Sequence, residues 1–238
     1  MKKAIVMGAS SGIGLEVARI LKERGWKVGV AARRAERLAE FAVTVQIDVT
    51  SEDAGERLVR LIGQLGGMDL YFHAAGIGWQ NRELQEDIEL KTMETNAIGF
   101  TRMVGTVYRY MAVHGGGHIA VISSIAGTKG LGPAPAYSAT KALQNTYIEA
   151  LEQLANARGL NIRFTDLRPG FVDTDLLRPT AVGDGMRYPI LLDPTAVAKE
   201  MVRSIERRQH VRVIDWRWRV VTAAWRFIPR CLWRHFKL

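Results

Sequence analysis

Residues 3–14 read KAIVMGASSGIG, an apolar run that leads directly into three glycines spaced as Gly8-x3-Gly12-x-Gly14. A helix-like segment follows, so the stretch predicts a strand, a tight turn and the start of a helix. Glycine permits both the turn and a close backbone approach, and the helix N-terminus offers N–H donors to an anion such as a dinucleotide pyrophosphate. The spacing differs from the more usual G-x-G-x-x-G, and a plain glycine-rich turn is the alternative.

The same order of apolar run and helix-like segment repeats along the chain. Further apolar runs lie at 27–32, 43–48, 68–76, 118–124, 161–170 and 211–214. Helix-like segments lie at 12–25, 33–42, 52–66, 83–113 and 135–159. This alternation predicts a parallel sheet with helices on both faces. We therefore expect one α/β domain over residues 1–214, with a Rossmann-like, doubly wound sheet in three layers (α/β/α), followed by an amphipathic helical tail at 215–238.

Length and cysteine content limit the class of protein. The 238 residues suit a single domain with a sizeable core. Cys231 is the only cysteine, so an intrachain disulfide is impossible and a reducing, cytoplasmic location is expected. No apolar stretch is as long as the roughly 18–20 residues that a membrane-spanning helix needs. We expect no metal ion.

Two arginines follow the second apolar run, which ends at Ala32. At this place an NAD-selective site has a carboxylate for the ribose 2′-OH, whereas an arginine accommodates the 2′-phosphate of NADP. Arg33, followed by Arg34, therefore favours NADP(H) over NAD(H); the alternative is a solvated, basic first turn of a helix. At the end of the next run, Asp48 is expected either to accept hydrogen bonds from the adenine end of the cofactor or to cap the following turn.

Tyr137 and Lys141 lie four residues apart in the stretch YSATK. On a helix these positions share a face, with Cβ atoms roughly 5–6 Å apart. A cation held that close typically lowers the pKa of an acid by about 1–3, so the tyrosine would become more useful for proton transfer. The alternative is a Tyr-x3-Lys pair on an ordinary solvated helix.

Seven short motifs occur in a characteristic order. They are MGASSGIG at 7–14, AARR at 31–34, HAAG at 73–76, TNAIG around Asn96, ISSIAG at 122–127, YSATK at 137–141 and RPGFVDT at 168–174. With these motifs the chain, from residue 3 to about residue 214, resembles the short-chain dehydrogenases/reductases of the main single-domain group. The resemblance implies the same sheet architecture and a nicotinamide cofactor.

In this family the tyrosine that matches Tyr137 is the catalytic acid/base, which implies that Tyr137 gives a proton to the substrate oxygen as hydride arrives from the nicotinamide. The matching Lys141 is expected to lower the pKa of Tyr137 and to hydrogen-bond the nicotinamide ribose. Ser124 matches the serine that hydrogen-bonds the reacting oxygen, whereas Ser123 is expected on the opposite face of its strand. Asn96 matches the residue that interrupts a helix and holds a water near the lysine.

The resemblance also implies a set of cofactor-binding residues, taken from the glycine-rich turn and the ends of the apolar runs. They are Gly8, Ser10, Ser11, Gly12, Ile13, Gly14, Arg33, Asp48, Val49, Ala75, Gly76, Tyr137, Lys141, Pro169, Gly170, Val172 and Thr174. Val172 and Thr174 are expected to meet the nicotinamide carboxamide and the phosphates. HAAG departs from the family, because His73 and Ala74 replace two asparagines. We interpret His73 as a core histidine rather than a second acid.

The expected substrate wall is mostly apolar. Its candidates follow Gly76, follow Ser124, or lie in residues 173–193, which interrupt the alternation and are typical of a loop over a site. They are Ile77, Trp79, Leu131, Leu176, Leu177, Met186 and Tyr188. Unless these side chains pack only on one another, they favour a lipophilic ketone, aldehyde or corresponding alcohol. We expect an NADP(H)-dependent oxidoreductase; the alternative is a non-catalytic, NADP(H)-sensing protein on the same fold.

The formal charge of +9 is concentrated near the C-terminus, where residues 205–238 carry nine Lys and Arg against two acids. As a helix with a bend at Pro229, the tail would have an apolar stripe opposite a basic face. The stripe is Trp218, Val221, Trp225, Ile228, Leu232 and Phe236, and the basic face is Arg219, Arg226, Arg230, Arg234 and Lys237. This pattern is typical of a helix on the surface of an anionic membrane.

Other partners were weighed for the tail and for the domain. The stripe would equally pack on the protein itself or on another subunit, and its apolar character disfavours nucleic acid, which we do not expect as a partner. Family members usually pair through the helices that here correspond to 83–113 and 135–158, so we expect at least a homodimer. The tail follows the run 211–214, where many relatives form a second interface, and there it would obstruct a tetramer.

Overall fold

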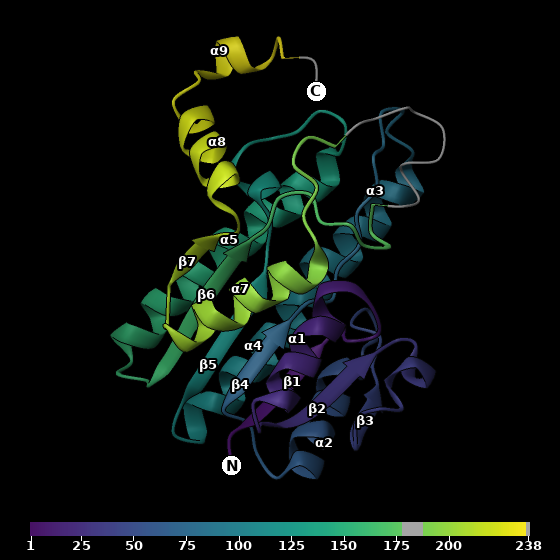
Figure 1. Ribbon diagram of the computed structural model, residues 1–238, viewed down its shortest axis with the longest axis vertical. Helices are drawn as coiled ribbons and strands as arrows, with labels where there is room; N and C mark the ends of the chain where they lie inside the picture. The colour runs from purple at the N-terminus through teal and green to yellow at the C-terminus, as the bar shows by residue number, and fades with distance from the viewer. Residues whose placement is uncertain (178–187, 237–238) are drawn as a thin grey trace.

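All neighbouring strands of the central sheet are parallel (Figure 1). The structure is a computed structural model that describes residues 1–177 and 188–236. Within these residues the strands follow the order β3-β2-β1-β4-β5-β6-β7. They are β1 (Lys3–Met7), β2 (Lys27–Ala32), β3 (Val43–Gln46), β4 (Leu70–His73), β5 (Gly117–Ile122), β6 (Ile162–Arg168) and β7 (Val211–Val213). After β3 the chain crosses back to the middle of the sheet, where β4 pairs with β1 on the side opposite to β2. The predicted doubly wound α/β fold is therefore confirmed.

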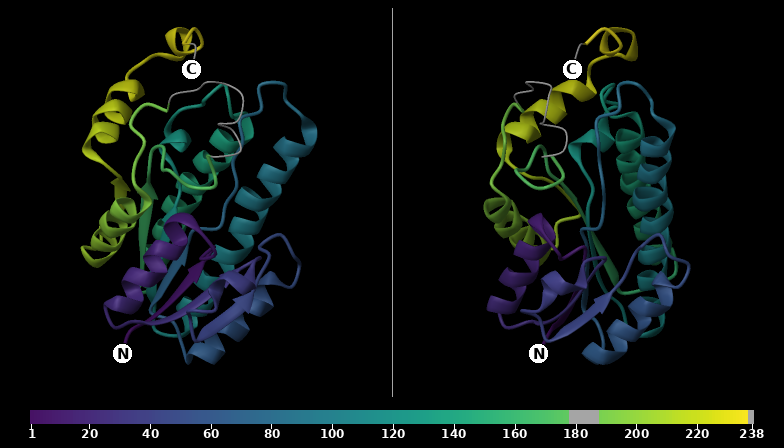
Figure 2. Two further views of the ribbon diagram at one scale, coloured as in Figure 1. Left: turned by 45° about the vertical axis from the view of Figure 1, so that its right-hand side comes forward. Right: turned by 90° about the vertical axis from the view of Figure 1, so that its right-hand side faces the viewer.

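Helices cover both faces of the sheet and complete three layers (Figure 2). The helical elements are α1 (Gly12–Glu23), η1 (Ala35–Leu38), α2 (Ala54–Leu65), α3 (Glu86–Met93), η2 (Glu94–Gly99), α4 (Phe100–Val113), η3 (Ile125–Thr128), α5 (Pro135–Ala157), α7 (Pro194–Glu206), α8 (Trp216–Arg226) and α9 (Arg230–Trp233). Side chains of β1 alternate between the two cores: Ala4 and Val6 pack with α1 and α7, whereas Ile5 and Met7 pack with α2 and α4.

The glycine-rich turn between β1 and α1 has no room for side chains. Gly8 has φ +88°, and a Cβ on it would lie 2.5 Å from the amide nitrogen of Ala75. A Cβ on Gly14 would lie 2.4 Å from the carbonyl oxygen of Gly8. Glycine at these positions therefore allows α1 to begin directly above β1, with its N-terminus at the carboxyl edge of the sheet.

Two predicted helices differ in the structure. Residues 33–42 form only the 3-10 turn η1, because one turn is enough to bury Leu38 and Phe41, the two large apolar side chains of the segment. The helix predicted at 83–113 is divided into α3, the π-helical segment η2 and α4. Asn96 lies in the π-helical segment, so the predicted interruption at this residue is present.

The C-terminal tail is helical and lies beyond the carboxyl edge of the sheet (Figures 1 and 2). It divides at Pro229 into α8 and α9, as predicted. Trp218 and Trp225 of the apolar stripe are buried, so these side chains cover the protein's own body, which was the alternative to a lipid surface. Over residues 1–177 and 188–236, no helix has the length and apolar character needed to cross a membrane.

Candidate active site

A cavity of about 960 Å³ lies at the carboxyl ends of the parallel strands. This is the expected place for a ligand in a doubly wound α/β fold. The cavity is lined by every residue predicted to bind the cofactor, and by the predicted catalytic residues Ser124, Tyr137 and Lys141. Asn96 does not line it, although it supports the wall, as described below.

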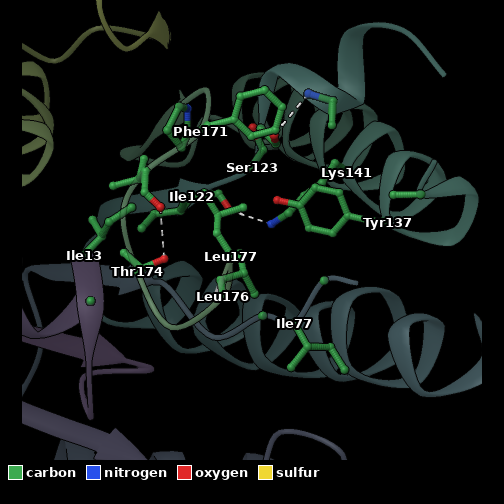
Figure 3. Close-up of a pocket in the computed structure, with 18 of the residues that line it drawn as sticks. Ile13, Ile77, Ile122, Ser123, Tyr137, Lys141, Phe171, Thr174, Leu176 and Leu177 are labelled. Atoms are coloured by element: carbon green, nitrogen blue, oxygen red, sulfur yellow. Dashed lines mark hydrogen bonds between the residues drawn. The ribbon is translucent and has the colours of Figure 1, made fainter. Parts of the chain in front are cut away.

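Tyr137 and Ser124 face each other at one end of the cavity. Tyr137 comes from the first turns of α5, and Ser124 is the residue that caps η3, just after β5. Their side chains are hydrogen-bonded, and Ser124 Oγ also accepts from the Ala126 amide at 3.1 Å. In Figure 3 the phenol of Tyr137 and the ammonium of Lys141 both point into the cavity. The three predicted side chains are therefore brought together.

The pKa of Tyr137 differs from the sequence prediction. Burial raises the pKa of Tyr137, and the hydrogen bond from Ser124 opposes this only in part. Lys141 is 5.6 Å from the centre of the tyrosine ring, and its ammonium donates instead to the carbonyl of Ile122 (3.0 Å) and to Gln144 Oε1 (2.9 Å). The net pKa of Tyr137 is therefore raised rather than lowered as predicted, and Tyr137 is protonated at neutral pH.

Lys141 is itself a buried cation. Burial lowers the pKa of Lys141 to about 8, and the negative charge of Asp166 opposes this change. Asp166 belongs to a buried cluster behind β5, where it accepts from Ser123 Oγ and is paired with Arg168 at 2.6 Å. The hydroxyl of Ser123 is therefore engaged by Asp166, although Ser123 also lines the cavity.

Asn96 acts on the site through hydrogen bonds to the backbone. Its side-chain oxygen accepts from the Ile77 amide (2.9 Å), and its side-chain nitrogen donates to the Ile77 carbonyl (2.6 Å). Its own carbonyl accepts from Gln144 Nε2 at 2.8 Å. Gln144 therefore joins Asn96 to Lys141. Sequence reasoning did not name Gln144, although its place three residues after Lys141 puts it on the same face of α5.

His73 is a core residue, as interpreted from the sequence. It is buried, its Nδ1 lies 2.8 Å from the hydroxyl of Tyr71, and its ring packs edge-on against Phe100. Burial, together with the charge of Lys141, lowers the pKa of His73 to about 3. The histidine is therefore neutral over the physiological pH range.

The opposite end of the cavity is polar and basic. The guanidinium of Arg34 lies 3.5 Å from Ser10 Oγ and 3.4 Å from Ser11 Oγ, beside the glycine-rich turn, and the exposed Arg33 also lines the cavity. Asp48 accepts from the amide (3.0 Å) and hydroxyl (2.8 Å) of Thr50, so it caps the following turn, which was the alternative.

The loop after β6 crosses the glycine-rich turn. A Cβ on Gly12 would lie 3.2 Å from Cγ2 of Thr174, and the Thr174 hydroxyl donates to the carbonyl of Val172 at 3.4 Å (Figure 3). On its other side the loop contacts the tail, because a Cβ on Gly170 would lie 2.2 Å from Nε1 of Trp218. Gly170 therefore allows the indole to lie against the backbone of this loop.

The shape and chemistry of the cavity fit a dinucleotide cofactor. The tight turn at Gly8 and Gly14 brings the N-terminus of α1 to the cavity, where the first N–H groups of a helix suit a pyrophosphate, and Arg33 and Arg34 supply positive charge near the strand end that would meet the adenosine ribose. Over residues 1–177 and 188–236, no group of His, Cys, Asp and Glu side chains is arranged to hold a metal ion.

Most of the predicted substrate wall is in place, and the tail adds to it. Ile77, Trp79, Leu131, Leu176, Leu177 and Tyr188 line the cavity. Met186 lies outside the described residues. Lining residues that sequence reasoning missed include Phe171 and, from the tail, Trp218, Val221, Ala224, Trp225, Ile228, Trp233 and Phe236. For five of these the signal was the amphipathic stripe, for which a membrane and the protein itself were both considered as partners.

Comparisons with known proteins agree with this geometry. The family model of the short chain dehydrogenases matches residues 2–183. An uncharacterized oxidoreductase of Myxococcus xanthus is 32% identical over 244 residues, covering 97% of this chain and 94% of that protein. A solved variant of actinorhodin polyketide ketoreductase with NADPH is 28% identical, with a TM-score of 0.74 over 85% of this chain and 89% of that one. A short-chain dehydrogenase/reductase of Burkholderia phymatum with NAD shares the fold, at 21% identity and a TM-score of 0.81 over 93% and 92% of the two chains.

The family match spans far more than half of the chain, and the bacterial relative aligns along nearly its whole length. The match includes the glycine-rich turn, Ser124 and the Tyr137–Lys141 pair, which the structure places around one cavity. The resemblance inferred from the seven motifs is thereby confirmed. The chain belongs to the short-chain dehydrogenase/reductase family of oxidoreductases.

Proposed function

We propose that the protein is an NADP(H)-dependent enzyme that interconverts a lipophilic ketone or aldehyde and its alcohol, with Tyr137 as acid and base. One observation carries this proposal: a half-buried, protonated Tyr137 is hydrogen-bonded to Ser124 and lies beside the buried Lys141, in a cavity with many apolar lining residues. Residues 1–214 are proposed to carry the cofactor and the chemistry. The tail, 215–238, is a separate addition to that domain.

In the reduction, the bound cofactor supplies a hydride to the carbonyl carbon. Ser124 donates a hydrogen bond to the carbonyl oxygen and holds it beside the phenol, and Tyr137 gives that oxygen its proton. The positive charge of Lys141 stabilises the tyrosinate that remains. Donors placed where negative charge develops act mainly on the transition state, and one such donor is commonly worth about 3 kcal/mol.

The proposed roles of the other site residues follow from their contacts. Asn96 holds the backbone of Ile77 at the cavity wall, and Gln144 accepts a hydrogen bond from Lys141. Gly8, Gly12 and the first turn of α1 would hold the pyrophosphate.

The proposed preference for NADP(H) rests on residues of this chain. Solved relatives include one bound to NADPH and one bound to NAD. Here the second strand ends at Ala32 rather than at a carboxylate, and Arg33 and Arg34 follow it. The guanidinium of Arg34 already lies near the hydroxyls of Ser10 and Ser11, so a 2′-phosphate would meet charge-assisted donors.

Replacing Tyr137 by Phe removes the proton donor and leaves the cofactor turn unchanged. We expect kcat for carbonyl reduction to fall by about 100-fold or more, the usual contribution of a positioned acid, while the Kd for NADPH stays within about twofold. Steady-state kinetics and fluorescence titration measure the two quantities. The matched control is Tyr147→Phe, on the same helix but outside the cavity lining, which should behave like wild type. Retention of more than about a tenth of the activity, a barrier change below ~1.4 kcal/mol, would show that Tyr137 is not the acid.

The pH dependence should follow Lys141. The charged lysine favours loss of the proton from Tyr137, and the lysine loses that charge as the pH rises through about 8, its lowered pKa. We therefore expect kcat/KM for reduction to be constant below this pH and to decline above it, because Tyr137, with a raised pKa, stays protonated in both ranges. A profile that stays flat up to about pH 10, the ordinary pKa of a lysine, would contradict this assignment.

The arginine pair should discriminate between the two cofactors. Arg33→Ala and Arg34→Ala should each raise KM for NADPH by about tenfold or more, because a hydrogen bond to a charged group is worth about 1.5–3 kcal/mol. KM for NADH should change by less than about twofold. Arg37→Ala is the control, since Arg37 is exposed in the same segment and lies outside the cavity lining. Equal effects of Arg33→Ala and Arg34→Ala on the two cofactors would refute the NADP assignment.

We also propose a homodimer formed through α4 and α5. These helices and the adjoining η2 expose large apolar side chains, namely Ile98, Val113, Leu143 and Leu154. Such side chains suit burial against a second copy of the same helices.

Peripheral membrane association remains a proposal, now resting on different residues. The buried part of the stripe is used inside the protein, but Trp216, Val220 and Phe227 are exposed on the outer surface of the tail, together with its arginines. Aromatic side chains next to arginines suit the surface of an anionic membrane.

Assembly and membrane binding are tested with the same protein preparations. Light scattering should give at least the dimer mass, and a monomer mass would exclude the dimer. In flotation with anionic liposomes, wild type should float, and the double substitution Trp216→Ser with Phe227→Ser should reduce the floating fraction severalfold. Equal flotation of the two proteins would exclude this membrane surface.

The alternative function is a cofactor-binding regulator that does not turn over its cofactor. It predicts NADPH binding without NADPH oxidation by any compound in a panel of aldehydes and ketones. The Tyr137–Ser124–Lys141 arrangement favours the enzyme instead, because a sensor has no need of a positioned acid beside a buried cation.

A further inference from the structure

The tail is attached to the loops that surround the active-site cavity. Trp218 is buried and packs edge-on against Phe171, with ring centroids 5.6 Å apart. The indole nitrogen of Trp225 donates to Thr128 Oγ1 at 2.9 Å, and that of Trp233 donates to the carbonyl of Gly130 at 2.8 Å. These contacts place the tail against two separate walls of the cavity, the loop after β6 and the segment after β5.

A further contact holds the segment between α8 and α9 to the residues that follow β5. Lys129 Nζ donates to the carbonyl of Ile228 at 2.8 Å and lies 5.3 Å from the ring centre of Trp233. The segment at Pro229 is thereby held to the same wall as both helices. The views of Figure 2 agree that α8 and α9 lie over the carboxyl edge of the sheet, where the cavity opens.

The inner surface of the tail is an apolar wall of the cavity. Val221, Trp225 and Ile228 line it from α8 and from the segment that follows α8. Ile77, Leu176 and Leu177, which Figure 3 labels together with Tyr137, also line the cavity. Tyr137 and Ser124 are the polar groups that would orient a carbonyl, so a bound molecule would place its carbonyl there and its apolar part beneath the tail.

A second cavity of about 670 Å³ continues beyond α9. It shares the lining residues Ala126, Leu131, Trp233 and Phe236 with the main cavity, so the two cavities lie on either side of these residues. Its walls include residues with small or absent side chains, namely Gly127, Gly130, Gly132, Ala139 and Ala142.

We propose that residues 216–236 form the binding site for the apolar chain of an elongated carbonyl substrate, with the carbonyl at Tyr137 and the chain running beneath Val221, Trp225 and Trp233. The inference rests on the proposed function, since it takes the carbonyl end to react at Tyr137. It assigns the tail to substrate selection. A short carbonyl compound would reach Tyr137 and Ser124 without touching the tail.

Two adjacent valines allow a matched test. Val221 lines the cavity, whereas Val220 is 61% exposed and does not line it. Val221→Trp puts a large side chain into the proposed path of the substrate's apolar chain, and Val220→Trp adds the same side chain to the outer surface. Each protein is assayed with NADPH and the aldehydes butanal, hexanal, octanal and decanal.

For wild type we expect kcat/KM to rise along this series by up to about fourfold per methylene, the equivalent of ~0.8 kcal/mol. Val221→Trp should lower kcat/KM for decanal by about tenfold or more and leave butanal within about twofold. Val220→Trp should match wild type throughout. A flat series in wild type, or an equal loss on all four aldehydes in Val221→Trp, would overturn the inference.

A binding measurement separates failure of the inference from failure of the proposed function. Calorimetric titration of decanal and butanal into the Tyr137→Phe protein with NADP⁺ requires no turnover. If no aldehyde is reduced by wild type, the proposed function is wrong. The inference then stands if decanal binds more tightly than butanal and Val221→Trp, combined with Tyr137→Phe, removes the difference. Equal binding of the two aldehydes contradicts it.

Discussion

The burial of one positive charge, the ammonium of Lys141, is the constraint on which the active site depends. A cation removed from water is costly unless nearby groups stabilise it. Here the carbonyl of Ile122 and the side chain of Gln144 accept from it, and Asp166 supplies a negative charge behind β5. These three groups are placed by three different elements: Ile122 by the end of β5, Gln144 by the first half of α5, and Asp166 by β6.

The π-helical segment η2 belongs to the same arrangement. It turns Asn96 so that the side chain holds the backbone of Ile77, while the main-chain carbonyl accepts from Gln144. The Asn96 carbonyl thus belongs to the hydrogen-bond network around Lys141, and the Asn96 side chain holds the cavity wall after β4. This segment therefore contributes both to the fold and to the active site.

The sequence predicted the sheet and most of the site, because those features depend on local pattern. Alternating runs gave strand positions, Gly8 and Gly14 marked a turn without room for side chains, and the Tyr137–Lys141 spacing indicated a shared helix face. The prediction of a lowered Tyr137 pKa was wrong for a physical reason. Residue spacing reveals a neighbouring charge but not the depth of burial, and here burial has the larger effect on the pKa. The spacing of Lys141 and Gln144 could have indicated their contact, but the hydrogen bond from Gln144 to Asn96, distant in the chain, could not be read from the sequence.

The tail shows a second limit of pattern reading. A helical wheel identifies an apolar stripe, but any apolar surface can cover it, and lipid, another subunit and the protein's own cavity all satisfy the pattern equally. The structure distinguishes these three partners through contacts that cannot be read from the periodicity of the sequence. One example is the indole of Trp218, which lies against the backbone of Gly170. That glycine belongs to the loop whose Thr174 meets Gly12 of the cofactor turn. One short loop therefore touches both the cofactor turn and the tail, so the walls proposed for cofactor and substrate are parts of one continuous structure.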